Sequence, residues 1–536
     1  MLRRAWKPIA GATVVIGVPT YAYLRYSKPE TFDLSVRERG PDGKPTRVTR
    51  PFPLLSKEQV DVRLSEHAQS VSTRRPGGIV WKQSTAFLPS NSPVEDANAS
   101  AIVEEEASPT GGDLLFFAVM DGHGGHQTSR LLSKTLIPAV TLELFTLKEA
   151  PSVLVPKGGF LSSLKSLIWP PAAVPPAASF DADPKYVSLA IQTAFANLDS
   201  EIMNAPLRIL AEALSKQTPA EKNPTPDLSQ HPMGLAAMLP AMSGSCALMA
   251  LFDTAHRNLY VACTGDSRAV AGVWEETEDG KGIWRVDVLS EDQTGRNPNE
   301  LRRMQSEHPP EEANDIISRG RIFGGLEVVR AFGDARYKWS KEVQALLFKV
   351  FLEGTEERMR APSPLLRTPP YVTPRPVITH RKLHNLPLNS PDTVSPKPQS
   401  TLRFIILATD GLWDELTSEE AVALVGGHLA GLKGVVTKQQ LAEKGPTRDG
   451  EGKTLDGKAA GRDTNTSDKW AFVDDNVSTH LIRNAFGGAD EYALRRLLSI
   501  PAPYSRSRRD DVTCTVVYWE DGREEEASVT SFSKKS

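Results

Sequence analysis

The stretch DLLFFAVMDGHGG, residues 113–125, decides which fold this sequence can adopt. Residues 114–120 are all apolar, and an unbroken apolar run of this length between turn residues predicts a strand buried on both faces. The run ends at Asp121-Gly122, and His123 and two more glycines follow. A buried carboxylate is costly unless it is paired or binds a metal, and glycines let a ligand approach the backbone. These residues alone leave two equal interpretations, a strand-ending turn and a ligand site.

Acidic residues recur where other apolar runs begin or end. They are Asp266 in YVACTGDSR (260–268), Asp410 in RFIILATDGLW (403–413), Asp510 and Asp511 before VTCTVVYW (512–519), and Glu95 and Asp96 in NSPVEDA (91–97). Acids at the ends of several strands can meet at one edge of a sheet. Mg²⁺ and Mn²⁺ take oxygen ligands of this kind, typically one or two carboxylates per ion. The pattern therefore predicts a divalent-cation site, with a simple turn pair as the alternative for Glu95 and Asp96.

In their order along the chain, these motifs resemble the metal-dependent Ser/Thr protein phosphatases of type 2C, the PPM family. The resemblance covers residues 87–519, with insertions. Four further stretches resemble the pyruvate dehydrogenase phosphatase branch of that family: NSPVED (91–96), LSEDQTGRNPNELRRMQSEHP (289–309), RAFGDARYKW (330–339) and THLIRNAFG (479–487). Runs of strands mixed with separate helices favour an α+β fold with an antiparallel sheet. The resemblance implies an antiparallel β-sandwich flanked by helices on both faces.

The resemblance also implies a role for each acid. Two ions, Mg²⁺ or Mn²⁺, would neutralise a phosphate and activate a water molecule between them. The matching positions are Asp121 as the bridging ligand, Asp410 and Asp510 on the first ion, the Gly122 carbonyl on the second, Glu95 and Asp96 acting through bound waters, and Asp266 with Asp410 on a third, weaker ion. Asp414 either joins that third site or faces solvent. For Asp511, a capping or supporting role is favoured over metal binding.

Two further positions bear on catalysis and substrate binding. His123 resembles the general acid of the family, and the ordinary pKa of histidine, about 6.5, suits that role. Asn91 stands on the substrate-binding side, where many members carry an arginine, and an amide cannot supply a charged bidentate fork. The phosphate-binding cation is thus unassigned. Arg330 lies beside GGLEVVRAFGD, although a structural salt bridge is the favoured interpretation for it.

Composition limits the class of protein. The chain has 536 residues, of which 40% are hydrophobic and 24% charged, as in ordinary globular proteins. The net charge of −3 argues against a general nucleic-acid binder. Cys246, Cys263 and Cys514 all lie in apolar runs without metal-ligand spacing, so they are expected in the core rather than in disulfides.

The N-terminal segment has a distinct composition. Residues 1–7, MLRRAWK, are basic and free of acids, and residues 8–24 carry no charge. The first feature is typical of a mitochondrial presequence, and the second is at the short end of the ~17–25 residues that span a bilayer. We expect residues 1–28 to target mitochondria and to anchor the chain in the inner membrane. Matrix and intermembrane-space orientations both stay open, as does a cleaved signal or a buried helix.

The rest of the chain divides by composition into a linker, one catalytic domain and a tail. The expected boundaries are 29–53 for the linker, 54–520 for the domain with insertions near 150–184, 205–240 and 431–469, and 521–536 for a polar tail. Apolar spacing predicts helices at 129–147, 186–203, 299–306, 342–352, 418–426, 475–486 and 489–498. Residues 244–274 predict two strands joined at 253–258, with Asp266 at the far end of the hairpin.

These features together predict a metal-dependent protein serine/threonine phosphatase. The resemblance implies a phosphoprotein substrate, with the phosphoserine of the pyruvate dehydrogenase α subunit as the leading candidate. Two alternatives belong to other classes: an inactive, membrane-anchored adaptor of the same fold, and a small-molecule phosphohydrolase. The acids at Asp121, Asp410 and Asp510 argue against the inactive adaptor.

Overall fold

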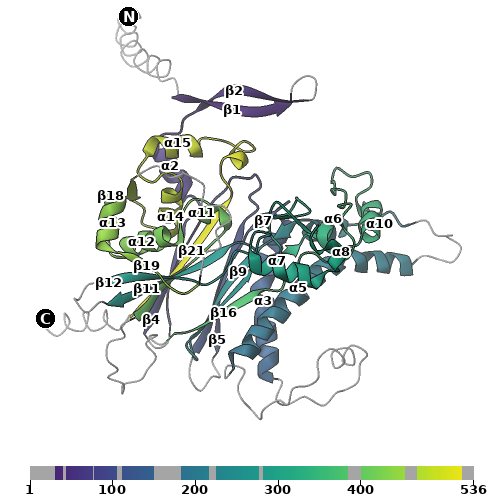
Figure 1. Cartoon of the computed structure of the whole chain (residues 1–536), viewed down its shortest axis with the longest axis horizontal. Coiled ribbons are helices and arrows are strands. Elements are labelled where there is room, and N and C mark those ends of the chain that lie inside the picture. Colours follow the sequence, from purple (N-terminus) through teal and green to yellow (C-terminus); the bar gives the residue numbers. More distant parts are fainter. Residues whose placement is uncertain are drawn as a thin grey trace, which may run out of the picture.

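Two β-sheets stacked face to face form the centre of the molecule, and helices cover the outer face of each (Figure 1). The computed structural model describes residues 30–39, 44–75, 78–105, 112–149, 183–216, 225–276, 282–383, 400–452 and 468–521. The arrangement confirms the predicted α+β class, with a β-sandwich flanked by helices on both faces. All neighbouring strands in the two sheets are antiparallel except β12 and β19, which pair in parallel.

The order of strands brings segments from distant parts of the chain together. The five-stranded sheet has the order β16 (Val377–Lys382), β10 (Asn258–Thr264), β9 (Ala247–Asp253), β6 (Gly112–Met120) and β5 (Ala97–Glu105). The seven-stranded sheet has the order β19 (Thr447–Asp449), β12 (Gly282–Val288), β11 (Arg268–Glu276), β17 (Ser400–Ala408), β21 (Val512–Asp521), β4 (Ile79–Leu88) and β3 (Gln69–Arg74).

Strand β6 is buried on both faces, as its apolar run predicts. Leu115, Phe117 and Val119 point between the sheets and belong to the same cluster as Ile405 and Leu407 of β17. The alternate residues Leu114, Phe116, Ala118 and Met120 pack instead with the helices on the outer face. Successive side chains of a strand point to opposite faces, so a strand between two apolar layers needs an apolar residue at every position.

The predicted helices are all present. Helices α3 (Gln127–Glu149) and α5 (Pro184–Ser215) cover the five-stranded sheet, while α2 (Lys57–Ser65), α12 (Ser418–Leu429) and α14 (Val477–Ala485) cover the other. The remaining predicted helices are α7 (Pro298–Glu307), α10 (Lys341–Phe351) and α15 (Glu491–Leu498). At the start of α5, the Asp183 side chain accepts a hydrogen bond from the Lys185 amide and Pro184 occupies the first turn, both common helix-start features.

Short elements complete the fold around one end of the sandwich. They are α6 (Gly234–Met242), α8 (Pro310–Ala313), α9 (Ala335–Lys338), α11 (Asp410–Trp413), the 3₁₀ helix η3 (Ser505–Ser507), and strands β13 (Ile317–Ser318) and β14 (Arg321–Ile322). Strands β7 (Gly122–His123), β8 (Gly244–Ser245) and β15 (Phe332–Gly333) form a small sheet directly after β6. This small sheet fixes the position of His123.

The predicted linker at 29–53 is wrong for the residues that the structure describes. Strands β1 (Thr31–Arg39) and β2 (Pro45–Pro53) form an antiparallel hairpin. Phe32, Leu34 and Val36 alternate with exposed residues and pack, with Leu54, against Ile500. The high content of Arg, Pro and Thr concealed this three-residue alternation.

Two predicted insertions also contain regular structure. Within 431–469, β18 (Gly434–Thr437), α13 (Lys438–Lys444) and β19 are formed and Leu441 is buried, and β20 (Lys469–Phe472), with the buried Trp470, begins at the end of this range. Within 205–240, α5 continues to Ser215 and α6 begins at Gly234. The predicted hairpin turn between β9 and β10 is correct, but residues 244–274 also contain β8 and a further long strand, β11, which begins after Asp266.

Other predictions fall partly or wholly outside the described residues. These are the N-terminal segment 1–28, the insertion at 150–182 and most of the tail, 522–536. Among the residues that are described, no helix is both long and apolar enough to cross a membrane. All three cysteines are buried with free thiols, as expected.

The hairpin gives a test of the corrected N-terminal boundary. Leu34 is 4% exposed, so Leu34→Ala should leave a cavity and destabilise the packed hairpin by about 2–5 kcal/mol. The neighbouring Ser35 faces solvent, and Ser35→Ala should change stability by no more than about 0.5 kcal/mol. Hydrogen exchange of the β1 and β2 amides measures both effects. Equal protection in the two variants would contradict this packing.

Candidate active site

Three aspartates meet at one end of the sandwich. Asp121 follows β6, Asp266 lies between β10 and β11, and Asp410 begins α11 directly after β17. Each offers a carboxylate oxygen, and these oxygens lie within 4.8 Å of one another. The two sheets both end here, so strands that are far apart in sequence place their acids side by side, as the sequence pattern predicts.

Electrostatics at this cluster favours a bound cation. Burial, followed by repulsion from Asp410, Asp96 and Asp266, raises the pKa of Asp121 well above its ordinary value. Burial and the neighbouring Asp511 likewise raise the pKa of Asp96 to about 8. Like charges that are buried together hinder each other's ionisation, and a divalent cation among them would reverse that effect. The donor set is made of hard oxygens, which fits Mg²⁺ or Mn²⁺.

Gly122 is required by close packing. A Cβ atom at this position would collide with the backbone carbonyl of Glu95, and it would also approach Ser129 Oγ. The same carbonyl accepts a hydrogen bond from the Ser129 hydroxyl. Glycine therefore lets the loop that carries Glu95 lie directly against the end of β6.

Asp511 organises the loop that carries Asn91 and Glu95. Its carboxylate accepts hydrogen bonds from the backbone amides of Ser90, Asn91 (2.8 Å) and Glu95 (2.9 Å). The Asn91 side-chain amide also donates to Asp511 Oδ2 at 3.1 Å and to Glu95 Oε2 at 3.0 Å. Asp511 thus has the supporting geometry favoured from the sequence. Both donor hydrogens of Asn91 are used within this loop.

Glu95 and Asp96 are bonded to residues that neighbour the site, Gly125 after His123 and Thr409 before Asp410. Glu95 Oε1 accepts a hydrogen bond from the Gly125 amide at 2.6 Å, so the acid also fixes the glycine turn after His123. Asp96 Oδ2 accepts one from Thr409 Oγ1 at 2.9 Å, next to Asp410. Their proposed action through metal-bound waters stays a prediction.

Asp510 lies beside the cluster but does not join the three acids that meet. Its carboxylate is paired with Arg506, four residues earlier, and accepts a hydrogen bond from the Asp511 amide at 2.7 Å. Its Cβ lies close to Gly411, where a side chain would also collide with the Asp511 carbonyl. The Asp510 side chain is thus paired with a cation, and its role as a metal ligand stays a prediction.

His123 is paired with an acid that the sequence did not assign. His123 Nε2 lies 2.8 Å from Asp334 Oδ2. Burial lowers the pKa of His123, but Asp334, together with Asp266 and Glu95, outweighs burial and the net shift is upward. A Cβ at Gly244 would collide with both groups, so a glycine in the neighbouring strand β8 makes the pair possible. Asp334 adopts a left-handed conformation (φ 56°) in the RAFGD motif, but no local pattern reveals a partner 211 residues away.

Arg330 is a structural residue, as favoured from the sequence. Its guanidinium forms a bidentate pair with Glu300 at 2.8–3.0 Å, and Nη1 donates to the Arg375 carbonyl at 2.6 Å. Both partners hold it inside the protein, so Arg330 does not supply the missing cation.

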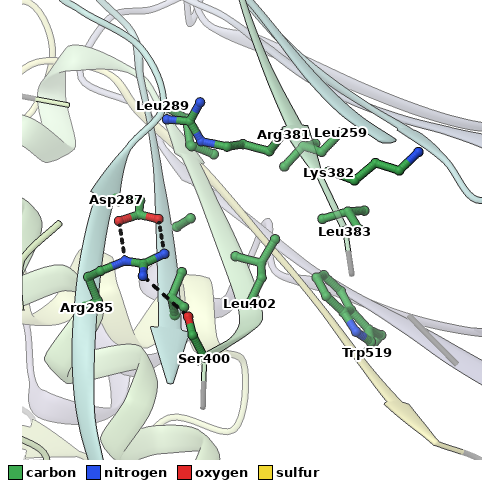
Figure 2. Close-up of a pocket in the computed structure, with 12 residues that line it drawn as sticks. Leu259, Arg285, Asp287, Leu289, Arg381, Lys382, Leu383, Ser400, Leu402 and Trp519 are labelled. Atoms are coloured by element: carbon green, nitrogen blue, oxygen red, sulfur yellow. Dashed lines mark hydrogen bonds and ion pairs between the residues drawn. The ribbon is translucent and has the colours of Figure 1, made fainter. Parts of the chain in front are cut away.

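A cavity of about 140 Å³ lies at the opposite end of the strands (Figure 2). Leu259 near the start of β10, Leu402 near the start of β17 and Trp519 near the end of β21 line it. The Arg285 guanidinium beside it is paired with Asp287 at 2.8 Å and bonded to Ser400. Asp266 and Asp410 follow the other ends of β10 and β17, and Asp510 and Asp511 precede the other end of β21, so the cavity is separate from the acid site.

Comparison with known proteins agrees with this site. The family described as Protein phosphatase 2C matches residues 188–444. A protein phosphatase 2C homologue of Schizosaccharomyces pombe is 34% identical over 460 residues, which cover 86% of this chain and 84% of the relative. The mitochondrial pyruvate dehydrogenase (acetyl-transferring)-phosphatase 1 of Saccharomyces cerevisiae is 34% identical over 495 residues, 87% of this chain and 73% of the relative.

A human relative, the mitochondrial pyruvate dehydrogenase (acetyl-transferring)-phosphatase 2, is 32% identical over 506 residues, 87% of this chain and 83% of the relative. The chain belongs to the protein phosphatase 2C family and is a serine/threonine protein phosphatase.

Proposed function

We propose that this phosphatase is metal-dependent and acts on a mitochondrial phosphoprotein. The cluster of Asp121, Asp266 and Asp410 within 4.8 Å is the observation that carries the proposal. With Asp510, these residues would hold two Mg²⁺ or Mn²⁺ ions. Asp266 and Asp410 would together hold a third, weaker ion. When bound, the ions supply positive charge against the phosphate and lower the pKa of water.

The chain's own residues would donate the proton to the leaving group and hold the proton donor in place. Asp334 occupies Nε2 of His123, so Nδ1 is the nitrogen left to donate a proton to the leaving serine or threonine oxygen. Pairing with Asp334 also favours the protonated ring that a general acid requires. Glu95 and Asp511 hold the loop and the glycine turn on either side of this histidine.

The proposed substrate is the phosphoserine of the pyruvate dehydrogenase α subunit. The names of two relatives support it, and the stretches 289–309, 330–339 and 479–487 resemble the same branch. The same relatives and the basic, acid-free residues 1–7 support a mitochondrial location. Residues 1–28 are proposed to target the chain and to anchor it in the inner membrane.

Asp121→Asn and Asp410→Asn test the metal site. Each should lower turnover of a phosphopeptide by about 100-fold or more, since the ions contribute several kcal/mol of charge stabilisation. Added Mn²⁺ should raise the melting temperature of the wild type and not of either variant, because only a formed site binds the ion. The matched control is Asp475→Asn, at a fully exposed side chain. Near-normal turnover by Asp121→Asn at saturating Mn²⁺ would contradict the assignment.

His123→Gln and Asp334→Asn test the general acid. The loss of His123 should slow a phosphoserine peptide by about 100-fold or more, and Asp334→Asn should cause part of that loss. An aryl phosphate has a leaving group that needs little protonation, so both variants should hydrolyse it at rates much closer to wild type. Steady-state rates on the two substrates give the ratio. Equal losses on both would instead indicate a structural or metal-site role.

Deleting the gene tests the substrate and location. Phosphorylation of the pyruvate dehydrogenase α subunit should rise at least severalfold in mitochondria that lack the protein, measured by phosphoproteomics. The full chain should reverse the rise, and a chain without residues 1–28 should not, since it would stay outside mitochondria. An unchanged phosphorylation level would rule out this substrate, and rescue by the truncated chain would rule out the targeting role. Activity on sugar phosphates but not phosphopeptides would support a small-molecule phosphohydrolase.

A further inference from the structure

The proposed reaction needs a cation that binds the substrate phosphate, and the polar groups first considered for it are already engaged. Both donor hydrogens of the Asn91 amide go to Glu95 and Asp511. The Arg330 guanidinium is held by Glu300 and by the Arg375 carbonyl. His123 is paired with Asp334 and is reserved for the leaving oxygen. A direct side-chain cation for the phosphate, in addition to the charge that the ions would supply, would therefore have to come from another residue.

Arg506 lies at the edge of the acid cluster. It belongs to the short turn η3, its guanidinium pairs with Asp510, and 42% of its side chain is exposed. The preceding residue fixes the turn, because Ser505 Oγ donates a hydrogen bond to the Ser90 carbonyl at 2.6 Å. Arg506 is thus anchored to the same loop that carries Asn91, and its side chain remains open to solvent.

The two neighbouring arginines of this turn are placed differently. Arg509 is 5% exposed, and its Nη1 donates to the Pro89 carbonyl at 2.7 Å, so it is buried behind the loop. Arg508 is exposed, which makes it a charge-matched control two residues away. Of these three arginines, Arg506 is the one with an ion pair to an acid of the site.

The pairing of Arg506 with Asp510 is easily exchanged. A partly exposed ion pair contributes only about 0–1 kcal/mol, so little is lost when Arg506 turns to another anion. If Asp510 served as a metal ligand, the ion would share its charge and weaken its pairing with the Arg506 guanidinium. The planar fork of arginine matches two phosphate oxygens with fixed geometry, whereas lysine offers a point charge and an amide carries no charge.

We propose that Arg506 binds the phosphate of the substrate and supplies the positive charge that Asn91 lacks. This inference rests on the proposed function and adds to it a specific phosphate contact from the turn before β21. It makes Arg506 a substrate-binding residue and leaves proton transfer to His123. The ligand class is a phosphate monoester dianion on a protein side chain.

Arg506→Gln, Arg506→Lys and Arg508→Gln test the proposal in the full chain loaded with Mn²⁺. Calorimetry measures the binding of inorganic phosphate, and a separate titration without phosphate measures the binding of Mn²⁺. A hydrogen bond to a charged group contributes about 1.5–3 kcal/mol, so Arg506→Gln should weaken phosphate binding by about 10- to 100-fold. Arg506→Lys should keep part of the affinity, and Arg508→Gln should bind like the wild type. For a phosphopeptide, Arg506→Gln should raise KM more than it lowers kcat.

Three results would overturn the proposal. Unchanged phosphate binding by Arg506→Gln, with altered Mn²⁺ affinity, would show that Arg506 only balances the charge of Asp510. An equal loss in Arg508→Gln would show a general effect of basic charge. A loss that Arg506→Lys does not moderate, with altered circular dichroism, would show a structural role for the turn. Failure of the proposed function is distinct, because the wild type itself would then neither bind phosphate in the presence of Mn²⁺ nor hydrolyse a phosphopeptide.

Discussion

Mutual repulsion among the clustered carboxylates of Asp121, Asp266 and Asp410 is the constraint on which the rest of the structure depends. Two like charges about 4.8 Å apart repel by roughly 3–4 kcal/mol at an effective dielectric constant near 20. No local feature of the chain would gather them. They are held together because the strands before or after them are locked into two packed sheets. The packing of the apolar layers on both faces of β6 therefore offsets the electrostatic repulsion among the three carboxylates. A bound cation would remove that repulsion.

The groups around this cluster come from distant parts of the chain. Asp511 holds the loop of Asn91 and Glu95 from 416–421 residues away, and Asp334 holds His123 from 211 residues away. In each case a buried acid fixes a polar group that would otherwise have several orientations. The glycines at 122 and 244 complete this support, because any side chain there would separate the pairs. The positions of the site residues therefore depend on the lack of a side chain at Gly122 and Gly244 as well as on the supporting acids.

The sequence predicts most of the frame and only part of the site. The apolar run 114–120 and the helical spacing at 186–203 are local patterns, and both correspond to elements of the structure. The convergence of Asp121, Asp266 and Asp410 could be inferred because strand ends share an edge. The pairing of His123 with Asp334 could not be inferred, because a contact between two distant loops produces no periodic pattern in the sequence. The β1–β2 hairpin was missed for another reason, because only three buried positions of β1 alternate in a segment rich in polar residues.

The hairpin has a practical consequence for how the protein is handled. Its Phe52 ring packs edge-on against Tyr504 with centroids 5.7 Å apart, and the Tyr504 hydroxyl donates to Glu38 at 3.1 Å. Tyr504 immediately precedes the turn η3, which carries Arg506. An expression fragment that begins at residue 54 would remove both contacts and expose Leu54 and Ile500 to water. If such a fragment were soluble but turned over slowly, the cause would be the loss of the contacts that hold the turn η3. A fragment that begins before residue 30 keeps these contacts.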